Sequence, residues 1–188
     1  MREKIKEIIL ESIQVKEELL RTSIGDIVDI TSLIINCVKK EGKVILFGNG
    51  GSASDSQHIA AELVGRFKKD RQALAAIALT TNTSILTAIA NDYGYEMVFA
   101  KQIEGLAKKN DVAIGISTSG KARSVLMGIR QAKKMGVKTV ALTGGDGGEL
   151  AKTADITFIA PSSVTARIQE AHIMVGHAIC ELVEQEVC

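Results

Sequence analysis

The stretch VILFGNGGSASDSQHIAAEL, residues 44–63, decides which fold the sequence predicts. It begins with a run of apolar residues typical of a buried strand, continues through glycines and serines, and ends in a helical pattern. A buried strand that passes through a glycine-rich loop into a helix is typical of a parallel sheet covered by helices. The stretch therefore predicts one strand–loop–helix unit of an α/β protein.

Four further apolar runs repeat this pattern along the chain, each separated from the next by a helical segment. The predicted strands are 43–47, 73–79, 111–116, 137–142 and 155–160, and the predicted helices are 3–20, 26–40, 53–67, 82–90, 96–108, 121–135 and 163–185. The sequence thus predicts an α/β fold, a doubly wound five-stranded parallel sheet with an N-terminal helical extension.

Composition excludes several classes of protein. The 188 residues suit one domain, and no apolar run reaches the roughly 18–20 residues that a membrane span needs. With 23 basic and 22 acidic residues, nothing marks the surface for nucleic acid, and the local cluster KKDR (68–71) is expected to be the solvated end of an element. Three cysteines without a CxxC pair fit a reduced, cytoplasmic protein.

Three loops that follow predicted strands are suited to binding phosphate. They read GNGGSAS (48–54), STSGKA (117–122) and TGGDGGE (143–149). Glycines allow a close backbone approach, and a following helix N-terminus offers free N–H groups. The alternative is that these residues only make turns and caps. Since GNGGSA does not fit the dinucleotide pattern and no acid ends the second strand, a phosphorylated metabolite is a better ligand than a nucleotide.

His58 and Glu62 lie four residues apart, on one face of the helix that follows the first loop. They are candidates for chemistry, and the alternative is a simple surface pair. In the last helix, one apolar stripe is expected to face the sheet, with His172 as a core residue at its edge. A second stripe holds Gln169 and His177 and is expected to pack on another subunit, which would place both at a shared site.

Four motifs together resemble the phosphoheptose isomerases of the sugar isomerase (SIS) fold family. They are GNGGSASDSQHIAAEL, ALTTNTSILTAIANDYGYE, GISTSGKA and TARIQEAHIMVGHAICEL, and the likeness covers nearly the whole chain. The resemblance implies a single SIS domain over 1–188, with the helical segment 1–41 contributing to oligomerisation, and a cytoplasmic homotetramer. It implies an aldose–ketose isomerase that interconverts sedoheptulose 7-phosphate and D-glycero-D-manno-heptose 7-phosphate through an enediol. This is the first step towards the nucleotide-activated heptose of surface polysaccharides such as lipopolysaccharide.

The same resemblance implies the site residues by motif match. Glu62 and His177 are the expected catalytic pair. The expected substrate-binding residues are Asn49, Gly50, Gly51, Glu62, Asn91, Asp92, Ser117, Thr118, Ser119 and Gln169. One zinc ion per subunit is expected on His58, Glu62, Gln169 and His177. One departure concerns phosphate: the family loop usually reads STSGNS, and Ala122 here lacks the last hydroxyl.

Two other functions share these loops. A non-catalytic SIS protein would bind a replication-initiation partner, and such relatives typically lose the acid at Glu62 and the imidazole at His177. A SIS sensor would bind a sugar phosphate without converting it. Because both Glu62 and His177 are present, the sequence favours the enzyme.

Overall fold

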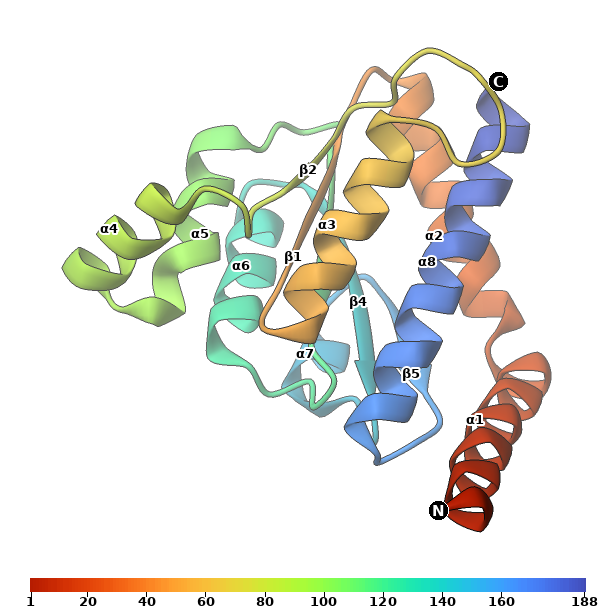
Figure 1. Ribbon diagram of the computed structural model, residues 1–188. Coiled ribbons are helices and arrows are strands. Elements are labelled where there is room, and N and C mark those ends of the chain that lie inside the picture. Colours follow the sequence, from red (N-terminus) through yellow and green to blue (C-terminus); the bar gives the residue numbers. More distant parts are fainter.

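A five-stranded parallel sheet forms the centre of the protein, and the computed structural model describes all of residues 1–188 (Figure 1). The strands are β1 (Val44–Gly48), β2 (Ala76–Ala78), β3 (Val112–Ile116), β4 (Lys138–Gly144) and β5 (Ile156–Ala160). Their order across the sheet is β2-β1-β3-β4-β5, and all neighbours are parallel. The predicted fold class is confirmed.

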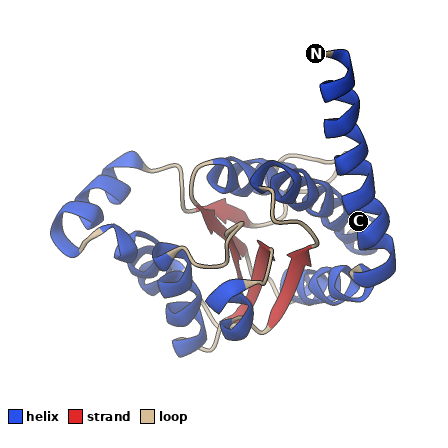
Figure 2. Ribbon diagram, turned by 90° about the horizontal axis from the view of Figure 1, so that it is seen from below, coloured by secondary structure: helices blue, strands red, loops and turns tan.

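Helices cover both faces of the sheet (Figure 2). They are α1 (Arg2–Thr22), α2 (Ile24–Lys39), α3 (Gly51–Val64), α4 (Thr83–Tyr93), α5 (Val98–Leu106), α6 (Arg123–Lys134), α7 (Gly148–Thr153) and α8 (Thr165–Val187), with a 3-10 turn, η1 (Tyr95–Met97), before α5. No helix is both long and apolar enough to cross a membrane.

Two hydrophobic cores result from the alternation of side chains along each strand. Val44 and Leu46 of β1 point into a core that also contains residues of α2, α3 and α8. Ile45 and Phe47 point to the opposite face, into a core with α5, α6 and α7. Because both faces are buried, the strands read as continuous apolar runs in the sequence.

Strand β2 is shorter than predicted. The apolar run 73–79 contributes only Ala76–Ala78 to the sheet, at its edge. The residues before it belong to a loop, because the Leu74 N–H donates to the carbonyl of Leu63 at the end of α3. A contact with α3 therefore replaces the first part of the predicted strand.

Helix α7 was not predicted, because its first residues lie in the glycine-rich stretch 143–149, which reads as a loop. Gly147, with φ 76°, precedes the helix, and Leu150 is buried within it. The Leu150 N–H donates to the carbonyl of Gly120, so α7 connects the loops after β3 and β4.

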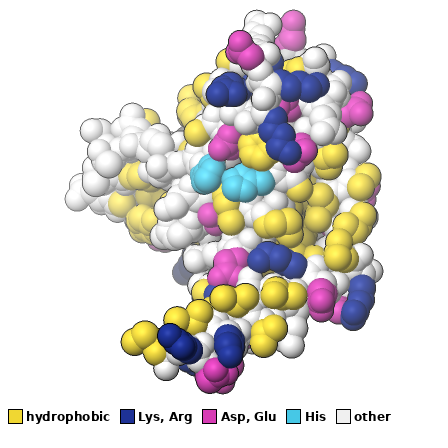
Figure 3. Space-filling view, turned by 45° about the vertical axis from the view of Figure 1, so that its right-hand side comes forward, with side chains coloured by type: hydrophobic (Ala, Val, Ile, Leu, Met, Phe, Trp, Pro, Cys, Tyr) yellow, Lys and Arg dark blue, Asp and Glu magenta, His cyan; other side chains and the backbone are white.

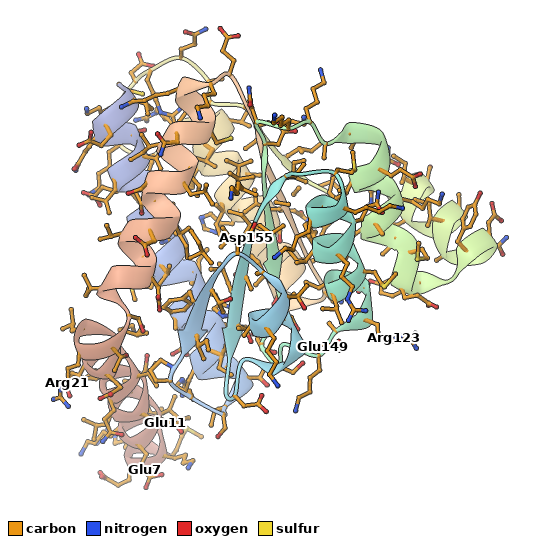
Figure 4. All side chains as sticks on the ribbon, turned by 180° about the vertical axis from the view of Figure 1, so that it is seen from behind. Glu7, Glu11, Arg21, Arg123, Glu149 and Asp155 are labelled. Atoms are coloured by element: carbon orange, nitrogen blue, oxygen red, sulfur yellow. The ribbon has the colours of Figure 1, made fainter.

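Helix α1 extends away from the rest of the protein (Figure 2). Only Val15 and Leu19 of this helix are buried. Near its middle, the buried Arg167 of α8 pairs with Glu11, labelled in Figure 4. The predicted helical extension is present, and much of its apolar surface is exposed.

Candidate active site

The glycine-rich loop after β1 leads directly into α3. Gly50 has φ 56°, a conformation that favours glycine, and the helix begins at the next residue, Gly51. N–H groups in the first turn of a helix have no intrahelical acceptor, so they are available to an anion. The Asn49 side chain is already engaged, since it donates to Ser124 Oγ (3.0 Å) and accepts from the Tyr95 hydroxyl (2.8 Å). The loop therefore offers backbone rather than side-chain donors.

The loops after β3 and β4 meet at the same edge of the sheet. Ser117 is buried at the end of β3, while Thr118 and Ser119 line a hollow of about 180 Å³. The other lining residues are Lys121, Gly144, Gly145, Asp146, Ser163, Thr165 and Ile168. Hydroxyl groups and an exposed Lys121–Asp146 ion pair thus surround a space next to the N-terminus of α8, where the hydroxyls and the helix N–H groups are donors suited to phosphate.

His58, Glu62 and His177 lie together on the surface between α3 and α8, and the two imidazoles are adjacent in Figure 3. His58 Nε2 is 3.2 Å from Glu62 Oε1 and 3.2 Å from His177 Nε2. One ligand atom of each of the three residues lies within 4.8 Å of the others. The His58 side chain is 48% exposed and that of Glu62 is 24% exposed, so a small molecule can reach the group.

Gln169 extends from α8 to the glycine-rich loop. A Cβ atom on Gly51 would lie only 2.3 Å from Gln169 Nε2, so the amide lies directly against this glycine. Gln169 makes no hydrogen bond within the chain, which leaves its amide free for a ligand. Gln169 precedes His177 by eight residues on α8, about 12 Å of helix rise.

Part of the second stripe of α8 packs on α3 of the same chain, and the predicted contact of this stripe with another subunit stays a prediction. A Cβ on Gly176 would lie 2.6 Å from Ile59 Cδ1, so the missing side chain allows the two helices to approach closely. Cys180 on the same stripe is also buried. This close packing is what places His177 beside His58.

Asn91 and Asp92 are not brought to this group within one chain. They lie on α4, which has no buried residue and stands at the opposite side of the protein from α8 (Figures 1 and 2). Asn91 Nδ2 donates to Asp92 Oδ1 (2.8 Å), and neither side chain bonds to another residue. Their predicted role in binding substrate remains a prediction.

His172 lies in the core, as the sequence predicts. It is fully buried, and its Nε2 lies 2.9 Å from the carbonyl oxygen of Thr143. Burial lowers the pKa of this imidazole from 6.5 to about 4, so the ring is neutral at pH 7 and Nε2 donates to the carbonyl. Nδ1 has no partner.

Sequence reasoning missed two features near the site. Asp55 precedes His58 by three residues and Glu62 by seven, so all three share a face of α3. Its Oδ2 is buried without a partner, and burial raises the pKa of the carboxyl to about 6. Arg71 is not solvated, as its cluster suggested, but forms a buried ion pair with Glu184. The helical spacing could have revealed Asp55, whereas no local pattern reveals Arg71.

Comparison with known proteins identifies the family. The SIS domain model matches residues 9–144. The phosphoheptose isomerase of Aquifex aeolicus is 55% identical over 100% of this chain and 98% of that protein, and the phosphoheptose isomerase of Sulfurimonas denitrificans is 49% identical over 100% and 97%. The chain belongs to the phosphoheptose isomerase family.

Solved structures of this family have the same fold. The phosphoheptose isomerase of Neisseria gonorrhoeae is 41% identical, with a TM-score of 0.93 over 98% of each chain. The phosphoheptose isomerase of Francisella tularensis is 35% identical, with a TM-score of 0.94 over 97% of each chain. The likeness includes the last helix, which carries His177 and lies beyond the matched SIS domain model.

Proposed function

We propose that this protein interconverts sedoheptulose 7-phosphate and D-glycero-D-manno-heptose 7-phosphate through an enediol. The observation that carries the proposal is the convergence of Glu62 of α3 and His177 of α8, and α3 begins at the glycine-rich loop proposed to bind phosphate. His58 follows Gly51 by seven residues, about 10 Å of helix rise. A heptose 7-phosphate carries its phosphate at one end and its reacting carbons, C1 and C2, at the other, so it can span the two parts.

Proton transfer between C1 and C2 requires a base on the carbon and an acid on the oxygen. In the proposed reaction, the Glu62 carboxylate takes a proton from C1 of the ketose. The His177 ring gives a proton to the C2 carbonyl oxygen, which produces the enediol. His177 then takes the proton from the C1 hydroxyl while Glu62 returns its proton to C2, which leaves the aldose and restores both groups. The Gln169 amide, free of other bonds, holds the sugar oxygens.

The donor set fits zinc. Two imidazoles and one carboxylate are common zinc ligands, and they converge here; Gln169 is proposed as a fourth, weaker ligand. Bound zinc would polarise the sugar's carbonyl and hydroxyl oxygens. Zinc on His58, Glu62, Gln169 and His177 is part of the proposal.

The oligomeric state is also proposed. Several apolar side chains of α1 are exposed, among them Ile5, Ile9 and Ile13. Next to them, α1, α2 and α8 surround an apolar hollow of about 350 Å³. Burial of this surface between copies of the chain would support a homotetramer to which residues 1–41 contribute. We propose the cytoplasm as the location, in keeping with three free cysteines.

The decisive experiment is turnover of sedoheptulose 7-phosphate by the purified protein in deuterium oxide, followed by NMR. Conversion with deuterium at C2 of the aldose is expected, because the proton that Glu62 takes from C1 exchanges with solvent before Glu62 delivers a proton to C2. The assay is repeated after chelation and after zinc is returned. No conversion under any of these conditions would contradict the proposed activity.

Matched variants identify the base. Glu62→Gln keeps the shape of the side chain and is expected to lower kcat by about 10²–10⁴-fold. Glu186→Gln makes the same chemical change at an exposed position of α8 and is expected to leave turnover unchanged. Near-normal turnover by Glu62→Gln would remove Glu62 from the mechanism.

A further inference from the structure

The loop between α3 and β2, residues 65–75, crosses α8 beside the candidate active site (Figure 1). It has no regular secondary structure, yet it is fixed by a buried carboxylate. Glu184 of α8 is 2% exposed and accepts hydrogen bonds from the backbone N–H groups of Phe67 (3.0 Å), Lys68 (2.8 Å) and Lys69 (2.6 Å). Three consecutive N–H groups on one carboxylate hold this part of the loop in a single conformation.

Arg71 connects the same carboxylate to the end of α3. Its Nε donates to Glu184 Oε2 (3.0 Å), and its side chain is 4% exposed. The other guanidinium nitrogens donate to the carbonyls of Glu62 (2.9 Å) and Leu63 (2.9 Å). Carbonyls in the last turn of a helix lack intrahelical donors, so Arg71 caps α3 at the turn that carries Glu62.

The loop places an aromatic ring against the imidazole of His177. The Phe67 and His177 ring centroids are 5.6 Å apart, with 31° between the planes. The His58 ring packs edge-on against His177, with a centroid distance of 4.9 Å and an angle of 67°. The His177 ring therefore lies in contact with two other rings, one from α3 and one from the loop.

Glu184 and His177 lie on the same face of α8. Seven residues separate them, which is two helical turns. One side of α8 thus carries both the imidazole and the carboxylate that anchors the loop packed on that imidazole.

We propose that Phe67 is a positioning residue that fixes the ring orientation of His177, and that the buried Arg71–Glu184 pair holds Phe67 in place. The proposal rests on the proposed function for its kinetic consequence, but the orientation of the ring can be measured without substrate. An imidazole has two rotatable bonds, and packing on Phe67 restricts the ring to the orientation that faces Glu62 and the substrate.

The test compares Phe67→Leu, Phe67→Tyr and a control, Lys69→Ala, in protein labelled on histidine. The chain has only three histidines, so their ring signals can be assigned by NMR. Phe67→Leu is expected to shift and broaden the His177 signals while the His172 signals stay in place. It should lower kcat about tenfold or more with KM within about twofold. Phe67→Tyr is expected to restore both properties. Lys69→Ala keeps the backbone N–H that donates to Glu184 and removes an exposed side chain without an ion pair or ring contact, so it should match the wild type.

The role of the Arg71–Glu184 pair is tested separately, by the sensitivity of the loop to trypsin. Trypsin cleaves after lysine and arginine, and the loop contains Lys68, Lys69 and Arg71. Because Glu184 fixes this loop in one conformation, Glu184→Gln is expected to make the folded protein sensitive to trypsin there. It should also reproduce the shift of the His177 signals. If Glu184→Gln does not fold, the positioning role of Phe67 is decided by Phe67→Leu alone, because this variant leaves the Arg71–Glu184 pair intact.

Unchanged His177 signals in Phe67→Leu would overturn the proposal. If the wild type shows no isomerase activity but the His177 signals depend on Phe67, the proposed function fails and the positioning role stands. A loop that resists trypsin in folded Glu184→Gln would overturn the role of the Arg71–Glu184 pair.

Discussion

His177 Nε2 lies 3.2 Å from His58 Nε2, although 119 residues separate the two histidines in the chain. Two imidazole nitrogens at this distance cannot both carry a hydrogen atom pointed at the other. Either one nitrogen donates to the other, or both bind a shared cation. Glu62 Oε1 also lies 3.2 Å from His58 Nε2, so the two histidines and Glu62 together support the proposed zinc site.

We therefore expect zinc to bind to the purified protein and to require both histidines. His177→Asn is expected to weaken zinc affinity by more than the 10–100-fold that loss of an outer-shell partner costs. Competition with a chelating dye measures this affinity without substrate. Glu181→Gln, one turn beyond His177, serves as the control and should bind zinc like the wild type. Equal affinity in wild type and His177→Asn would exclude this residue as a ligand.

Gly51→Ala is expected to weaken substrate binding without unfolding the protein. The new Cβ would lie 2.3 Å from Gln169 Nε2, so the amide must move away from the loop. Since the clash is with the end of a flexible side chain, the melting temperature should change little. KM for the sugar phosphate should rise about tenfold, corresponding to about 1.4 kcal/mol. An unchanged KM would show that the Gln169 amide plays no part in substrate binding.

Ala122→Ser is expected to stabilise the protein. Ala122 is the N-cap residue of α6, has an extended backbone (φ −65°, ψ 112°) and provides no side-chain cap. A serine hydroxyl there can accept a hydrogen bond from the first turn, which is worth about 1 kcal/mol. For a chain of this size, the melting temperature should rise by about 2–4 °C. Ala122→Val, which adds volume but no acceptor, is the control, and an equal rise in both variants would contradict the capping argument.

Protonation of Glu184 is expected to lower the free energy of unfolding in acid. Burial alone would raise the pKa of its carboxyl, but hydrogen bonds from the Lys69, Lys68 and Phe67 N–H groups and from Arg71 lower the pKa to about 2, against 4.5 in the unfolded chain. Between these values the unfolded state binds more protons, so the stabilisation is present above pH 4.5 and is lost as the pH falls towards 2.

Urea unfolding between pH 3 and pH 7 measures this effect. Glu184→Gln should have a lower midpoint at pH 7 and a shallower loss of stability on acidification than the wild type. Glu186→Gln removes one negative charge at the same end of α8 and controls for net charge. If the urea midpoints of Glu184→Gln and the wild type fall equally with pH, the Glu184 carboxyl does not contribute to the acid dependence of stability.

The sequence predicted the elements that local pattern determines. Strands β1 and β3 were visible because both of their faces are buried, which makes each an unbroken apolar run, and β4 and β5 were visible because most of their residues are apolar. The length of strand β2 was overestimated, since the residues just before it are held by the Leu74–Leu63 hydrogen bond to the end of α3, which local pattern does not reveal. Local composition also hid α7, because glycine-rich stretches read as loops.

The candidate site was predictable in part for the same reason. His58 and Glu62 lie one turn apart, so helical periodicity alone placed them together. The position of His177 depends on how α8 packs on α3, which periodicity cannot give, so the packing of Gly176 on Ile59 was not predicted. The cluster that contains Arg71 was interpreted as the solvated end of an element, because its partner, Glu184, lies 113 residues further along the chain.

The contact between Gly176 and Ile59 lies directly beside the two imidazoles, because each of these residues is the sequence neighbour of one histidine. The gap between the α3 and α8 axes at this level is thus governed by the bulk at position 176. Graded substitution from glycine through alanine to serine would widen that gap in small steps and move the donor nitrogens apart. The size of ion that the proposed zinc site would accept could thus be adjusted from position 176, which contributes no metal ligand of its own.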